Sequence, residues 1–96
     1  MKPSDALNQH RDDIRRIVAA NRATNPRVFG SVVRGEDADG SDLDILVDPL
    51  PETSLFDIGG IQYELQDLLG VPVDVLTPKG ISIRFRAAVL SEAVPV

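Results

Sequence analysis

The chain has 96 residues, of which 43% are hydrophobic, and its formal net charge is -5. A chain of this size can bury one modest core, so we expect residues 1–96 to form a single domain. The acidic charge argues against direct binding of nucleic acid, because such binding needs a basic surface that releases counterions. The absence of cysteine excludes disulfides, zinc–thiolate sites and cysteine nucleophiles.

Membrane and export signals are also missing from the sequence. No apolar run of signal-peptide length follows Met1, and no stretch approaches the roughly 20 apolar residues that cross a bilayer. We therefore expect a cytoplasmic protein with no membrane partner.

The predicted elements follow the order helix, strand, strand, helix, strand, helix. Apolar residues at helical spacing predict helices over residues 4–21, 54–69 and 81–92, the first two capped by the serine at which they begin. The pair Gly59-Gly60 in the second helix indicates either close packing against the sheet or a frayed first turn. Residues 94–96 are expected to fray.

Three short apolar runs predict the strands. One strand ends at Phe29, and the others cover residues 43–47 and 71–76, each bounded by glycine or proline. The fold class that follows is α/β of the α+β kind, a small mixed β-sheet packed by helices.

Aspartates interrupt both apolar strands in a regular way. Because side chains alternate along a strand, Asp42 and Asp44 emerge on the face opposite Leu43, Ile45 and Val47. Asp74 stands between two valines and can deliver a third carboxylate to the same edge of the sheet. Clustered carboxylates repel unless a cation neutralises them, and three could hold two Mg²⁺ ions.

A glycine turn supplies a second set of groups. Gly30-Ser31 follows the first strand directly, where the glycine lets the backbone approach a phosphate and the serine hydroxyl can donate to it. Arg34 closes the short helix expected after this turn. Its guanidinium could contact a phosphate or the last carbonyls of that helix, and the residues do not decide between the two.

The glycine turn and the D-x-D are each weak evidence of function when taken alone. With eleven aspartates in the chain, about one D-x-D is expected by chance, and there are two, at residues 37–39 and 42–44. A solvated strand end would also explain Asp42. The joint spacing of the glycine turn, the strand aspartates and Asp74 is what indicates chemistry.

The pattern Gly30-Ser31, ten residues, Asp42-x-Asp44 and a later Asp74 resembles the signature of DNA polymerase β-type nucleotidyltransferases. The small size and the ending 87–93 resemble the minimal nucleotidyltransferases. The resemblance implies the polymerase β-type fold, ATP as substrate and two Mg²⁺ ions as cofactors. It implies catalytic and metal-binding roles for the three aspartates, and nucleotide-binding roles for Gly30 and Ser31. Arg34 and Ser41 are predicted as further nucleotide contacts.

The resemblance also implies a partner. Minimal nucleotidyltransferases commonly accompany a HEPN-domain ribonuclease toxin and transfer AMP to one of its tyrosines, which makes them antitoxins. Two alternatives stay open: a non-catalytic antitoxin that neutralises its toxin by binding, and a transferase acting on a small molecule of the aminoglycoside type. Valines at positions 32 and 33 replace the smaller or polar residues usual in the family, and their extra methyl groups could crowd the phosphate pocket.

Other motifs fail at single positions. Residues 35–41 have the glycine spacing of a P-loop but lack its lysine, and residues 37–48 echo a calcium loop without its turn glycine. His10 has no triad partner, so packing is its expected role. Arginines on the first and last helices indicate solvated helix faces or contact with an acidic partner.

Overall fold

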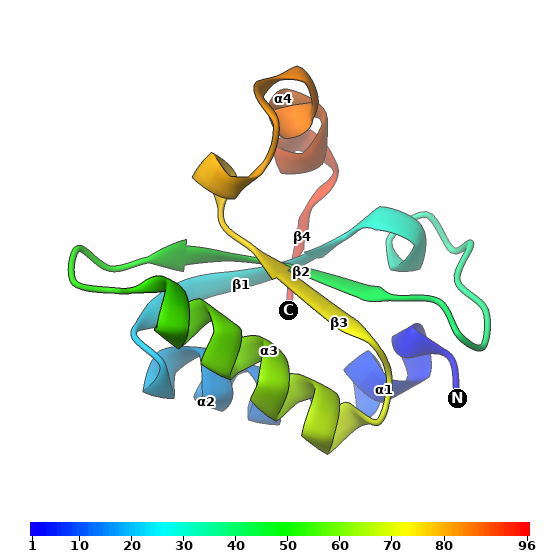
Figure 1. Cartoon of the computed structure of the whole chain (residues 1–96). Coiled ribbons are helices and arrows are strands. Elements are labelled where there is room, and N and C mark those ends of the chain that lie inside the picture. The colour runs from blue at the N-terminus through cyan, green and yellow to red at the C-terminus, as the bar shows by residue number, and fades with distance from the viewer.

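The computed structural model describes residues 1–96 and contains a four-stranded sheet in the order β3-β2-β1-β4 (Figure 1). β2 pairs antiparallel with β1 and parallel with β3, and β1 pairs antiparallel with β4. The predicted mixed sheet is therefore confirmed. The strands are β1 (Ala23–Phe29), β2 (Leu43–Pro49), β3 (Val73–Leu76) and β4 (Val94–Pro95).

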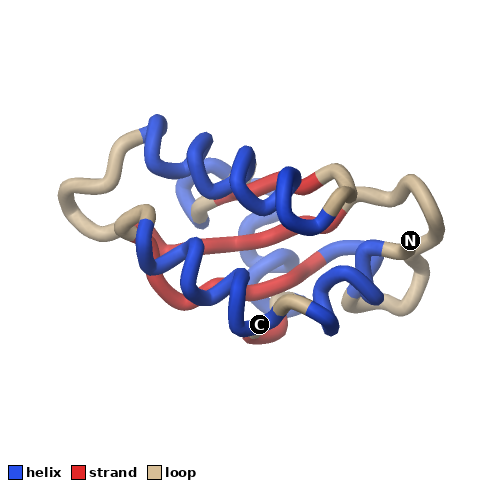
Figure 2. The backbone as a smooth tube through the Cα atoms, turned by 90° about the horizontal axis from the view of Figure 1, so that it is seen from below, coloured by secondary structure: helices blue, strands red, loops and turns tan.

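Helices cover the two faces of the sheet unequally. Three of them lie on one face and α4 lies alone on the other, so that the sheet forms the middle layer (Figures 1 and 2). None of the helices is long and apolar enough to cross a membrane. The helices are α1 (Pro3–Gln9), α2 (Arg11–Ala20), α3 (Leu55–Leu69) and α4 (Ile83–Glu92), with short 3-10 turns η1 (Gly30–Val32) and η2 (Pro78–Gly80).

The main core lies between the sheet and α1–α3. Leu43, Ile45 and Val47 of β2 are each 0% exposed and belong to this core, as their alternation predicts. A smaller cluster occupies the other face, where Phe29, Leu46 and Ile81 pack with residues of α4. Even-numbered residues of β2 therefore face α4.

The first predicted helix is wrong in two respects. It is broken at His10, whose backbone leaves helical geometry between α1 and α2. Ser4 is also not its cap, because α1 begins at Pro3, a residue suited to the first helical position. The N–H of Ser4 instead donates to Oδ2 of Asp37 at 2.9 Å, so a distant carboxylate serves this helix end.

The second predicted helix is confirmed as α3, with a difference at its start. Ser54 caps it in a reciprocal pair with Asp57, and Gly70 ends it in the left-handed conformation. The apolar side of α3 begins at Ile58, because Leu55, the first residue of the helix, is 88% exposed. Gly60 packs against the side chain of Asn21, the residue that directly follows α2, rather than against the sheet.

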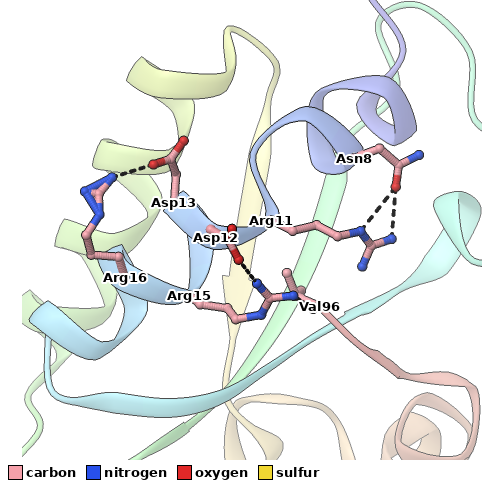
Figure 3. Close-up of polar contacts among 7 residues, drawn as sticks. All are labelled: Asn8, Arg11, Asp12, Asp13, Arg15, Arg16 and Val96. Atoms are coloured by element: carbon pink, nitrogen blue, oxygen red, sulfur yellow. Dashed lines mark hydrogen bonds and ion pairs between the residues drawn. The ribbon is translucent and has the colours of Figure 1, made fainter.

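The tail predicted to fray is ordered instead. β4 pairs with β1, Val96 is 7% exposed, and its carbonyl accepts a hydrogen bond from Nη2 of Arg15 at 2.8 Å (Figure 3). A proline between two valines carries no strand periodicity, so only the partner strand reveals this element. β1 ends at Phe29 as predicted and begins at Ala23, with an irregular register against β2 between Thr24 and Arg27.

Three arginines of α2 form side-chain hydrogen bonds or ion pairs with residues of α1 and α2. Arg16 bonds Asp13 at 2.6 Å, Arg15 pairs with Asp12, and Arg11 bonds Asn8 at 3.0 Å (Figure 3). These contacts join residues three apart on the helix surface. They support the interpretation of this arginine-rich surface as a solvated helix face.

Candidate functional site

Three chain segments meet at one edge of the sheet. The end of β1 and the starts of β2 and β3 lie there, since Phe29 is the cross-strand partner of Asp44 and Asp44 is the partner of Asp74. Asp44 is thus flanked by β1 on one side and by a second aspartate on the other. The structure brings these residues together as the strand pattern predicts.

The carboxylates point to the face of the sheet that α4 occupies. Leu43 and Val73, next to the two paired aspartates, are buried in the main core on the face that α1–α3 cover. The aspartates therefore project from the opposite face. Asp44 is partly buried, whereas Asp42 and Asp74 are exposed. The central carboxylate is therefore shielded and its neighbours are open to solvent.

Gly30 closely approaches the central carboxylate. Its φ is +79°, a conformation that favours glycine, and a Cβ atom built there would overlap Oδ2 of Asp44 and lie 3.3 Å from its Cγ. Any other residue at this position would displace the carboxylate or the turn. The requirement for glycine here thus comes from Asp44 as well as from the backbone.

Burial and charge both perturb Asp44. Desolvation is the larger cause, and the negative charges of Asp74 and Asp42 add to it, which raises the pKa of Asp44 from 3.8 to about 6. Like charges on adjacent strands destabilise a sheet. The edge therefore carries uncompensated negative charge in the absence of a cation.

The donor set at this edge suits a hard divalent cation. Asp42, Asp44 and Asp74 offer carboxylate oxygens alone, the ligands that Mg²⁺ prefers. As the side chains lie, no group of three metal-ligating residues converges on one point. The strands set the positions of the three aspartates, and the exposed side chains of Asp42 and Asp74 have room to rotate toward an ion.

The other three residues predicted to bind nucleotide differ in their contacts. Ser31 follows Gly30 in η1 and is partly exposed. Ser41 uses its hydroxyl to accept a hydrogen bond from the N–H of Ala38 at 2.9 Å, which closes its own loop. Arg34 makes ion pairs with Glu36 and Glu92, both at 2.7 Å, rather than capping helix carbonyls.

Two features of this region have no signal in the sequence pattern. Glu92, at the end of α4, meets Arg34 across 58 positions of the chain, and only the tertiary fold reveals that contact. Val32 and Val33 pack against the main core on the face that α1–α3 cover. Their side chains therefore point away from the face that carries Asp44.

The competing motifs are dispersed by the fold. Asp37 serves the start of α1, and Asp39 pairs with the N-terminal amine at 3.1 Å. Asp48 lies at the other end of β2, where Arg27 bonds it at 3.0 Å. The D-x-D at residues 37–39 therefore has a structural role, and the calcium-loop residues do not come together.

The largest hollow of the molecule lies away from the carboxylates. It measures about 350 Å³ and is lined by the last two residues of β2 and by residues that follow β3, at the opposite end of these strands. Its one carboxylate, Asp48, is already neutralised by Arg27, and this pairing lowers the pKa of Asp48. Clustered and uncompensated charge favours the edge around Asp44 as the functional site.

Comparisons with known proteins agree on one family. The profile described as a nucleotidyltransferase domain matches residues 7–96. A Methanocaldococcus jannaschii protein, named as a candidate protein adenylyltransferase, is 37% identical over 94% of this chain and 97% of its own length. A solved structure described as a minimal nucleotidyltransferase superposes with a TM-score of 0.86 at 39% identity, covering 97% of this chain and 95% of the other.

A more distant structure shares the fold. A toxin–antitoxin crystal structure with AMP-PNP has a chain that superposes with a TM-score of 0.75 at 20% identity, over 88% of this chain and 69% of the other. The sheet and helices described above are therefore an arrangement that other sequences also adopt.

Alanine substitutions at two glycines separate backbone strain from the contact with Asp44. Gly40→Ala, at a φ of +88° with open space around it, should cost about 1–2 kcal/mol of unfolding free energy from strain alone. Gly30→Ala should cost roughly 1–3 kcal/mol more, because the new methyl group overlaps a carboxylate in a packed strand. Denaturant unfolding measures both, and equal costs would show that Asp44 does not constrain Gly30.

A second prediction concerns the pH dependence of stability. Because the folded pKa of Asp44 is about 6 against an ordinary 3.8, ionisation of this carboxyl opposes folding. The cost is absent below about pH 4, grows as the pH rises to about 6, and is complete above that. Asp44→Asn should therefore match the wild type near pH 4 and exceed it by about 1–3 kcal/mol at pH 7.

The measurement is denaturant unfolding of both proteins across this pH range with a chelator present. The difference between the two proteins isolates Asp44 from the other carboxyls, which titrate in both. A stability difference that stays constant from pH 4 to pH 7 would contradict the assigned environment of Asp44.

Proposed function

Because the chain belongs to the nucleotidyltransferase domain family and to its minimal nucleotidyltransferases, we propose that it transfers AMP from ATP to a hydroxyl of a partner protein. The partner we propose is a HEPN-domain ribonuclease toxin, the acceptor one of its tyrosines, and the chain its antitoxin. Use of ATP and of such a partner implies a cytoplasmic location.

One observation carries this proposal. Asp44 lies between Gly30, which approaches it closely, and Asp74, its partner on β3. A backbone turn that suits phosphate thus directly adjoins a carboxylate pair that suits a metal. A nucleoside triphosphate with its divalent cation needs both groups together.

The chemistry is a displacement at the α-phosphorus of ATP. The acceptor oxygen forms a bond to that phosphorus, the bond to the bridging oxygen of the β-phosphate breaks, and pyrophosphate leaves. Asp74, exposed and beside Asp44, is positioned to accept the hydroxyl proton. Gly30 and Ser31 hold the triphosphate through backbone N–H groups and the serine hydroxyl.

Asp42, Asp44 and Asp74 would hold Mg²⁺, proposed as two ions. When bound, the metal supplies charge neutralisation for the phosphates and lowers the barrier to attack by the hydroxyl. The perturbed pKa of Asp44 supports this assignment, because a bound cation would stabilise the ionised carboxylate against the desolvation and the repulsion that raise this pKa. Arg34 and Ser41 are proposed as further nucleotide contacts, the latter after release of its loop hydrogen bond.

A protein acceptor fits the shape of the site better than a small molecule. The carboxylates line neither of the two hollows of the molecule, and two of the three are exposed. Such an open edge cannot enclose an aminoglycoside, whereas a side chain presented by a partner surface can reach it. The relative named as a protein adenylyltransferase and the toxin–antitoxin neighbour support the same choice.

Mass spectrometry tests the proposal. The candidate toxin is incubated with the chain, ATP and Mg²⁺, and we expect its mass to rise by whole multiples of one adenylyl group. Asp44→Asn and Asp74→Asn should reduce the transfer rate at least about 100-fold, since each removes a group acting in the transition state.

Asp39→Asn is the matched control, because Asp39 belongs to the other D-x-D, is 82% exposed and pairs only with the N-terminal amine. It should transfer at the wild-type rate. Toxin neutralised without a mass change would instead favour the alternative of an antitoxin that acts by binding alone.

A further inference from the structure

Arg34 is placed where a cation can act on the carboxylate edge. It follows η1, the turn that begins with Gly30 and Ser31, and its backbone N–H donates to the carbonyl of Gly30 at 3.3 Å. Because Gly30 closely approaches Asp44, Arg34 belongs to the turn that adjoins the central carboxylate. A triphosphate beside three aspartates needs such a positive group, because the ligand and the site are both anionic.

Two glutamates hold the Arg34 guanidinium at separate nitrogens. Nε donates to Oε1 of Glu36 and Nη1 donates to Oε1 of Glu92, each at 2.7 Å. These are short, charge-assisted bonds, and two of them fix the orientation of the planar group. Of its five N–H donors, three stay available, including both on Nη2. That remaining edge is the one that a phosphate oxygen could use.

The two glutamates differ in what they are attached to. Glu36 is two residues from Arg34, and its side chain is 62% exposed. Glu92 ends α4, and its side chain is only 24% exposed. α4 contacts the sheet through Val89, which packs against the smaller core cluster that contains Leu46 of β2. Glu92 therefore places Arg34 relative to the sheet, which Glu36 cannot do.

We propose that Glu92 is a positioning residue of the nucleotide site, which holds the Arg34 guanidinium at the carboxylate edge with its Nη2 donors directed to a phosphate oxygen of the bound nucleotide. This inference rests on the function proposed above. It gives α4, which contributes no fully buried residue, a role on this face of the sheet.

A double-mutant cycle tests whether Glu92 acts through Arg34. The affinity of a non-hydrolysable ATP analogue is measured calorimetrically with Mg²⁺ for the wild type, Arg34→Ala, Glu92→Gln and the double variant. We expect about tenfold weaker binding for Arg34→Ala, about three- to tenfold for Glu92→Gln, and no further loss in the double variant. Glu52→Gln, the matched control, changes an exposed glutamate in the loop after β2, away from Arg34, and should stay within about twofold of the wild type.

Glu92→Asp is the second variant, because it keeps the carboxylate but withdraws it by one methylene group. Its affinity should lie between the wild type and Glu92→Gln, which a role limited to α4 stability would not produce. Wild-type affinity in Glu92→Gln, or an equal further loss in the Arg34→Ala background, would overturn this inference and leave the proposed function intact. A wild-type protein that does not bind the analogue would overturn both.

Discussion

The placement of Asp44 at the start of the central strand is the constraint on which the rest of the site depends. β2 is buried against the helices through its odd-numbered residues, and this fixes the even-numbered Asp44 on the opposite face. The neighbouring strands then supply Gly30 on one side and Asp74 on the other. An ionised carboxylate in this position opposes folding, and the packing of the strand maintains it there.

The two faces of the sheet have different roles. The face covered by α1–α3 contains sixteen buried residues of the main core, and it supplies most of the apolar burial that stabilises the fold. The face covered by α4 has only a three-residue cluster around Leu46, which leaves room for the aspartates at its edge. A rigid layer on one side thus supports a polar, accessible site on the other.

Local periodicity predicts much of this arrangement. The alternation in β2 and β3 is sufficient to place Asp44 and Asp74 on one face, and a glycine directly after a strand marks the turn. Contacts between distant segments leave no such pattern. The N–H of Ser4 finds its acceptor in Asp37, Val94 finds its partner strand in β1, and Glu92 finds Arg34 only after the chain has folded. Those interactions depend on tertiary geometry rather than on local sequence.

Paramagnetic NMR tests the central claim most directly. Mn²⁺, which takes the same oxygen ligands as Mg²⁺, is titrated into the labelled protein, and broadening of the backbone amide signals is measured. We predict that the amides of Gly30, Asp44 and Asp74 broaden first, while those of Asp48 and Lys79, at the opposite end of the strands, broaden only at higher metal concentration. Early broadening at Asp48 and Lys79, or uniform broadening over the acidic surface, would contradict a metal site at this edge.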